Sequence, residues 1–190
     1  MNWKKIDDNW KAFVKENQLI DSSEETHYLY GKQQMYSAVE NFHDLQIYYQ
    51  QKVNKSANPG SSTYTGNGLT ITTPIETVEK WRVEIHQLSR WKQLFFSTGK
   101  LVIKASHNEI NEYIPHAKIE KLFIVCPDLK LSIRKFEKYH NPNIPFDQTV
   151  LVLETKHQPE TLEHLNQCRD IIINFLEKLV ANKKLKPIDS

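Results

Sequence analysis

The clearest pattern of apolar and polar side chains lies between residues 148 and 181. The run 150–153 is apolar without alternation, which is typical of a strand whose two faces are both covered inside a sheet. After Pro159 the apolar residues recur at steps of three and four, and charged residues fill the remaining positions, as on an amphipathic helix. This segment therefore predicts a central strand at 149–155 and a long C-terminal helix that packs on it.

The start of the chain also has a helical pattern. Apolar residues lie at helical spacing within 2–18, with lysines and acidic residues between them: Trp3, Ile6, Trp10, Phe13 and Val14. An amphipathic helix of this kind packs on a protein core, or it lies on a membrane surface or a partner. Because acidic residues are mixed with the lysines, we expect the apolar face to pack on the core.

The middle of the chain has the two-residue alternation and the turn residues of a sheet. Strands are predicted at 27–30, 34–39, 44–50, 69–72, 81–86, 93–96, 101–104 and 129–134. Gly31-Lys32 is expected to form a turn or bulge, and the hairpin through Gly99 is the clearest turn of the chain. The first three of these strands are expected to form an antiparallel meander.

Two further helices are predicted after residue 105. Ser106 and Glu109 have the spacing of a capping box, in which each side chain bonds a free backbone amide at the start of a helix. A second helical stretch, 117–125, is expected to stop before Pro127. Helical structure is therefore expected to begin at Ser106–Glu109 and to occur again over 117–125.

Strands in runs with helices mainly at the two ends indicate an α+β fold with a largely antiparallel sheet. We expect about six to eight strands, with an N-terminal helix and a long C-terminal helix packed on the sheet. The 190 residues suit one domain, 1–190. The polar, turn-rich segment 53–62 is the best candidate for a mobile loop or an internal boundary.

Composition narrows the classes of protein to consider. No apolar run approaches the roughly 20 residues that cross a bilayer, and the N-terminus lacks an export signal, so a soluble cytoplasmic protein without membrane contact is expected. Two cysteines without metal or disulfide spacing fit a reducing compartment. A formal net charge of +2 makes a dedicated nucleic-acid binder less favoured.

One motif has a catalytic mechanism attached to it. Glu154-Thr155-Lys156 ends the central strand, and Asp128, after Pro127, or Asp147 precedes it. Over about thirty residues this arrangement resembles the core of the PD-(D/E)xK nuclease family. The resemblance implies that an aspartate and Glu154 hold a divalent metal while Lys156 positions or activates the attacking water. The alternative is a strand end that simply enters solvent.

Other catalytic and cofactor signals are weak or missing. Cys168 lies on the apolar face of the C-terminal helix, and Cys126 follows the helix at 117–125, so both are expected to be core residues. The histidines have no zinc-site spacing, and the glycines form neither a phosphate-binding loop nor a nucleophile elbow. No metal and no cofactor is therefore expected.

Tyrosines gather in or near the first predicted strands, where they suit either a protein-binding surface or a half-buried sheet. Tyr28, Tyr30 and Tyr48 are the binding candidates. Since no catalytic motif dominates, the sequence favours a non-enzymatic protein that binds another protein, for example a toxin-neutralising immunity protein of a bacterial type. The alternatives are the metal-dependent nuclease and a small apolar-ligand carrier.

Overall fold

The computed structural model describes residues 3–28, 31–56, 65–88, 101–136, 143–156, 159 and 161–186. In these ranges the chain forms three α-helices, one 3-10 helix and nine strands. The helices are α1 (Trp3–Glu16), η1 (Asn108–Glu112), α3 (His116–Val125) and α4 (Leu162–Ala181). The strands are β1 (Ile20–Asp21), β2 (Glu24–Tyr28), β3 (Gly31–Phe42), β4 (Leu45–Ser56), β5 (Thr65–Pro74), β6 (Val83–Gln87), β7 (Leu101–Ala105), β8 (Lys130–Lys135) and β9 (Thr149–Glu154).

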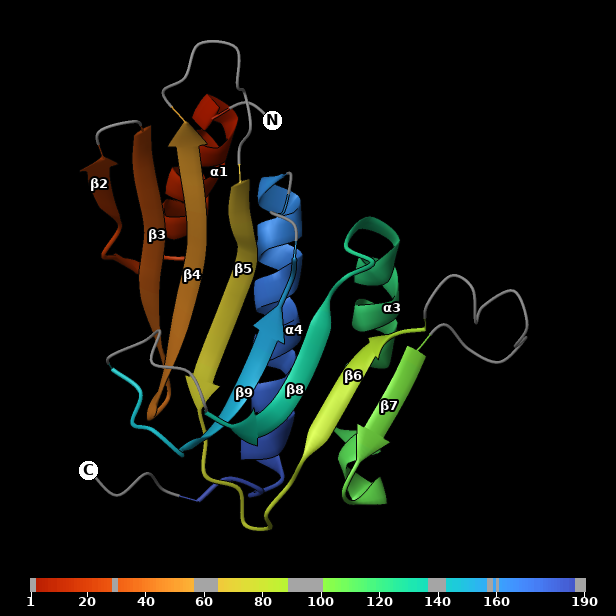
Figure 1. Cartoon of the computed structure of the whole chain (residues 1–190). Coiled ribbons are helices and arrows are strands. Elements are labelled where there is room, and N and C mark those ends of the chain that lie inside the picture. Colours follow the sequence, from red (N-terminus) through yellow and green to blue (C-terminus); the bar gives the residue numbers. More distant parts are fainter. Residues whose placement is uncertain are drawn as a thin grey trace.

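All nine strands belong to one antiparallel sheet, in the order β1-β3-β4-β5-β9-β8-β6-β7, with β2 also paired to β3. The helices α1, α3 and α4 lie together on one face of the sheet, and α4 contacts both of the others (Figure 1). This arrangement confirms the α+β class, with one strand more than the expected upper number. No helix within the described ranges combines the length and apolar character that spanning a bilayer requires.

Strand β9 occupies the central position that its apolar sequence predicts, between β5 and β8. On one face Leu151 and Leu153 join the main core, to which α4 contributes all of its buried residues. On the other face Val150 and Val152 form a smaller cluster with Tyr48 and Ile144. Both faces of the strand are therefore covered, as its lack of alternation indicates.

Helix α1 buries its apolar face against the sheet, as expected. Phe13 is fully buried and its ring lies 5.4 Å from that of Tyr49 on β4. The Trp10 ring lies 5.5 Å from that of Tyr36 on β3. Aromatic pairs at such distances add packing energy to the burial of their surface.

A partly buried ion pair joins α4 to strand β3. The Arg169 guanidinium donates to both oxygens of Glu40 on β3, with Nε 2.9 Å from Oε2. The Tyr49 hydroxyl donates to the same carboxylate. The side chains of Arg169 and Glu40 are 21% and 11% exposed, so this contact is largely shielded from solvent.

The expected capping box at Ser106 and Glu109 is wrong. Helical structure does begin there, as the 3-10 helix η1, but its N-cap is His107 and no side chain caps it. The Ser106 hydroxyl instead accepts from the Arg82 N–H, 3.0 Å away, beside the β6–β7 ladder. Glu109 pairs with Lys184, just after α4. Both side chains therefore form tertiary contacts instead of capping the helix.

Two other local expectations are changed by the structure. Gly31 and Lys32 pair with Tyr28 and His27 as the start of β3, so they are strand residues and not a turn. In the expected loop at 53–62, residues 53–56 continue β4, while 57–62 lie outside the described residues. The strand predicted at 93–96 and the turn through Gly99 also lie outside them.

Candidate functional site

Three of the residues singled out by the PD-(D/E)xK resemblance, Asp128, Glu154 and Lys156, line one pocket of about 380 Å³ at the end of β9. We call it the strand-end pocket; its lining residues are Gly68, Thr70, Asp128, Lys130, Glu154, Thr155 and Lys156. In the sheet, Thr70 of β5 and Lys130 of β8 are the two register partners of Glu154. Three neighbouring strands therefore present their side chains at one place.

A close backbone contact forms the floor of the strand-end pocket. The Thr155 N–H donates to the Leu69 carbonyl at 2.9 Å, and the Leu69 N–H donates to the Thr155 hydroxyl at 3.0 Å. A Cβ atom placed on Gly68 would lie 2.0 Å from the Thr155 carbonyl oxygen. Only glycine therefore allows β5 and the end of β9 to approach this closely.

Both carboxylates of the strand-end pocket already have partners. Glu154 forms an ion pair with Arg134, with 3.3 Å between Oε2 and the guanidinium. Asp128 accepts a hydrogen bond from the Lys156 N–H at 2.8 Å, which fixes it beside the chain after β9. Lys156 itself is exposed, so its ammonium group is accessible to a molecule in the pocket.

The sequence did not decide whether Asp128 or Asp147 lies beside Glu154, and the structure distinguishes them. Asp147 lies 3.4 Å from Lys135, at the far end of β8 and β9. Because the two strands are antiparallel, Asp128 reaches the same end as Glu154 and Asp147 reaches the opposite end. Asp128, Glu154 and Lys156 are thus the three motif residues that come together.

The strand-end pocket offers two carboxylates and two lysines to a ligand. Magnesium is commonly held by one or two carboxylates together with water and substrate phosphate. Within the described ranges, no group of three or more histidine, cysteine, aspartate or glutamate side chains could hold a metal ion. A metal here would therefore depend on Asp128 and Glu154 alone.

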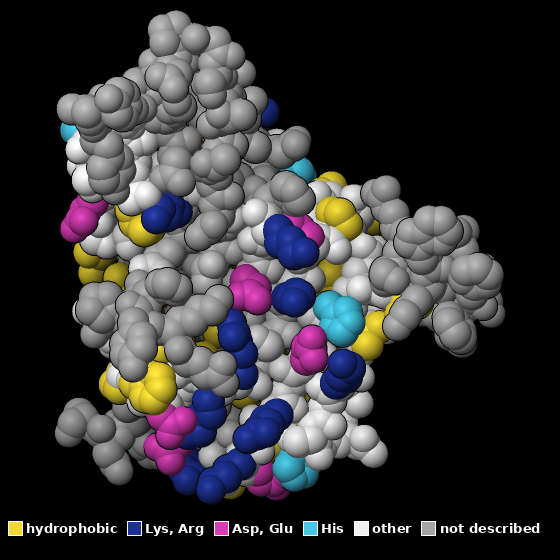
Figure 2. Space-filling view, in the orientation of Figure 1, with side chains coloured by type: hydrophobic (Ala, Val, Ile, Leu, Met, Phe, Trp, Pro, Cys, Tyr) yellow, Lys and Arg dark blue, Asp and Glu magenta, His cyan; other side chains and the backbone are white. Residues whose placement is uncertain are grey.

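Beside this pocket the sheet has a face that no described helix covers. We call it the open face; it consists of the outward side chains of β6, β7, β8 and the end of β9, which are Glu84, His86, Val102, Lys104, Lys130, Ser132, Arg134 and Glu154. Figure 2 shows basic and acidic side chains mixed over this surface. Glu84, for example, lies 3.6 Å from both Lys104 and His86.

Of the tyrosine candidates, only Tyr48 has a side chain in the described part of the chain. Tyr48 is only 7% exposed, packs in the small cluster beside β9 and donates to Gln46 at 2.6 Å. Tyr36 and Tyr49 are fully buried, so these three tyrosines build the core of the sheet. Tyr30 and the side chain of Tyr28 lie outside the described residues.

The cysteines are core residues, as the sequence predicts. Cys126 and Cys168 are both free thiols and both buried. Burial raises the pKa of the Cys168 thiol well above its ordinary value, which disfavours the reactive thiolate. Cys168 is therefore unsuited to nucleophilic catalysis in this fold.

A second pocket, of about 350 Å³, lies between α1 and strands β2 and β3. We call it the α1 pocket; its lining residues are Asp7, Trp10, Lys11, Asp21, Ser23, Glu25, Lys32, Gln34 and Tyr36. No spacing in the sequence indicates it, because it forms only when the helix docks on the sheet.

No family model, curated protein or solved structure matches the chain.

Proposed function

We propose that the chain is a non-enzymatic interaction protein that binds another protein through the open face of its sheet. The observation that supports this most directly is the one-sided arrangement of the fold, with α1, α3 and α4 on one face and charged side chains on the other (Figures 1 and 2). A role as an immunity-like protein in the cytoplasm belongs to the same proposal. The two free, buried cysteines are compatible with that compartment.

The mixture of charges favours a protein over a nucleic acid as the partner. Among its described side chains the open face has three basic residues, Lys104, Lys130 and Arg134, against the acidic Glu84 and Glu154. A surface that binds nucleic acid gains its affinity by neutralising many phosphates and needs a larger excess of positive charge. Alternating signs instead suit a partner surface with the complementary pattern, since such patterns set specificity and association rate.

The first test reverses charge on the open face. The variant Lys130→Glu/Arg134→Glu should bind a partner at least tenfold more weakly than the wild type, because two attractive contacts become repulsive. The matched control Lys5→Glu/Lys15→Glu changes the same charge on exposed positions of α1, and its affinity should equal that of the wild type. The partner is first captured from a lysate of the source cells, then purified, and its Kd is measured by calorimetry.

Two results would contradict this proposal. One is a purified partner that binds the open-face variant as tightly as the wild type. The other is a failure of the folded wild-type protein to retain any partner that binds again after purification. Circular dichroism of each variant establishes that the fold is intact before affinities are compared.

A second candidate function is metal-dependent hydrolysis of a phosphodiester in the strand-end pocket. It is favoured by one observation: Asp128 and Lys156, 28 residues apart, meet beside Glu154 in a single pocket. In this case the two carboxylates would hold Mg²⁺, and the Lys156 ammonium would position the attacking water or stabilise charge on the phosphate. The chemistry matches the roles that the family resemblance implies.

The second test is cleavage of plasmid and single-stranded DNA by purified protein with Mg²⁺ or Mn²⁺. If the pocket is catalytic, Glu154→Ala and Lys156→Ala should each reduce the rate about 100-fold or more, because each removes a group that acts on the phosphate. Glu177→Ala and Lys15→Ala, at exposed helical positions, should leave the rate unchanged. Absence of metal-dependent cleavage by the folded wild type would reject this candidate.

A further inference from the structure

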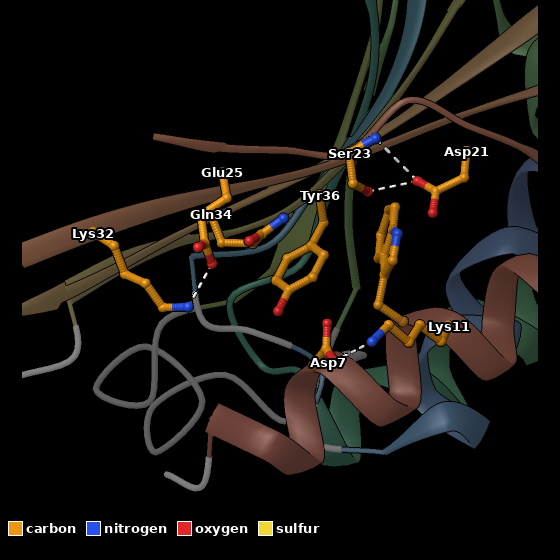
Figure 3. Close-up of a pocket in the computed structure, with 9 residues that line it drawn as sticks. Asp7, Lys11, Asp21, Ser23, Glu25, Lys32, Gln34 and Tyr36 are labelled. Carbon is orange, nitrogen blue, oxygen red and sulfur yellow. Dashed lines mark hydrogen bonds and ion pairs between the residues drawn. The ribbon is translucent and has the colours of Figure 1, made fainter. Parts of the chain in front are cut away.

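The α1 pocket has a buried hydroxyl group pointing into it. Figure 3 shows the Tyr36 hydroxyl directed between two ion pairs, one formed by Asp7 and Lys11 and the other by Glu25 and Lys32. Tyr36 comes from β3, the first ion pair from α1, and the second pair joins neighbouring strands β2 and β3. Three separate elements thus converge on one polar cavity.

Two buried donors at this cavity have no hydrogen-bond partner among the described residues. They are the Tyr36 hydroxyl and the Trp10 indole N–H, and both side chains are 1% exposed. Buried polar groups in folded proteins are almost always paired, so an unpaired one requires an explanation. Burial and the facing Asp7 carboxylate raise the pKa of Tyr36, so its hydroxyl keeps its proton and remains a donor near neutral pH. A bound acceptor would pair with the Trp10 N–H and would compete with the Asp7 carboxylate for the Tyr36 hydroxyl.

The charges around the hydroxyl define which ligand fits. The Lys11 ammonium lies 2.6 Å from Asp7, the Lys32 ammonium contacts Glu25, and Asp21 accepts from Ser23 at 2.6 Å. A simple anion in this cavity would meet three carboxylates, and a simple cation would meet two ammonium groups. A ligand that has both charges can instead contact each ion pair with its opposite charge.

We propose that the α1 pocket binds a free amino acid or a closely related small zwitterion. Its carboxylate accepts from the Tyr36 hydroxyl and lies near a lysine, and its ammonium group lies between the Asp7 and Glu25 carboxylates. The cavity volume, about 350 Å³, is at the lower end of ligand pockets, which suits a molecule of this size. Because the pocket lies on the helix side of the sheet, this site is independent of the open face.

The test is calorimetric titration of the full-length protein with each of the twenty common amino acids. Acetate and methylammonium serve as probes that have one charge each. We expect at least one amino acid to bind with a Kd below about 1 mM and neither single-charge probe to bind comparably. Tyr36→Phe should weaken this binding about tenfold, because it removes the hydroxyl and keeps the ring that packs on Trp10. The control Tyr48→Phe, on the other face of the sheet, should bind like the wild type.

A second variant keeps the proposal testable if Tyr36→Phe is poorly folded. Lys11 is 69% exposed, so Lys11→Gln removes a charge from the rim of the pocket without disturbing the core, and it should weaken binding several-fold. The proposal is overturned if no amino acid binds the wild type at 10 mM probe concentration. It is also overturned if acetate or methylammonium binds as tightly as the best amino acid, or if the folded variants bind with unchanged affinity.

Discussion

Replacing Arg169 by alanine is expected to lower the free energy of unfolding by about 3 kcal/mol. The guanidinium makes two hydrogen bonds to Glu40, whose side chain is only 11% exposed. Without it, the carboxylate remains in a largely buried position, where the Tyr49 hydroxyl still donates to it. The loss is large because a charge left in the interior without its opposite charge is poorly solvated.

The matched control is Arg134→Ala, which breaks an ion pair of the same chemical type near the protein surface. Arg134 and Glu154 are 37% and 35% exposed, so this change should cost less than about 1 kcal/mol. Urea denaturation followed by circular dichroism measures both values. Equal effects of Arg169→Ala and Arg134→Ala would contradict the view that the Arg169–Glu40 pair is shielded from solvent and stabilises the fold. A double-mutant cycle with Glu40→Ala should give a coupling energy well above that of the surface pair.

The parts of the fold that were predictable from the sequence are those determined by local pattern. The run 150–153 indicated a central strand, and α4 follows from an apolar stripe repeated over 20 residues. The contact between Arg169 and Glu40 spans 129 positions and leaves no local trace in the sequence. The burial of Tyr48 was also not predictable from local pattern. The alternation of side chains along β4 does not say which face is covered, and the residues that pack on Tyr48, such as Ile144, lie far away in the sequence.

In the candidate site, too, some features follow from local sequence pattern and others depend on long-range contacts. Glu154 and Lys156 are two positions apart at a strand end, so their placement on one side follows from the period of a strand. Whether Asp128 or Asp147 joins them depends on the antiparallel register of β8 and β9, which pairs Lys130 with Glu154. The α1 pocket requires the docking of a helix on two strands, which no short-range spacing reports. Sequence pattern thus predicts the elements and their faces, while pairing and docking determine which side chains meet.

Replacing Gly68 by alanine is expected to lower the free energy of unfolding by about 2–3 kcal/mol. The added Cβ would lie 2.0 Å from the Thr155 carbonyl oxygen and 2.4 Å from its hydroxyl oxygen, far inside contact distance. The first of these atoms belongs to the backbone, so a side-chain rotation cannot relieve the clash. The end of β9 must move away from β5, which weakens both hydrogen bonds between Leu69 and Thr155.

Hydrogen exchange can show which residues lose stability in this variant, and by how much. In Gly68→Ala the amides of Leu69 and Thr155 should exchange faster than the fall in global stability explains, since their hydrogen bonds are lengthened in the native state. Ser132→Ala, at a half-buried position of β8 on the same face, should change stability by less than about 0.5 kcal/mol and leave these amides protected. If Gly68→Ala is as stable as the wild type with unchanged exchange, the close approach of β5 to Thr155 is wrong. The strand-end pocket would then lose the floor that places Glu154 and Lys156 beside Asp128.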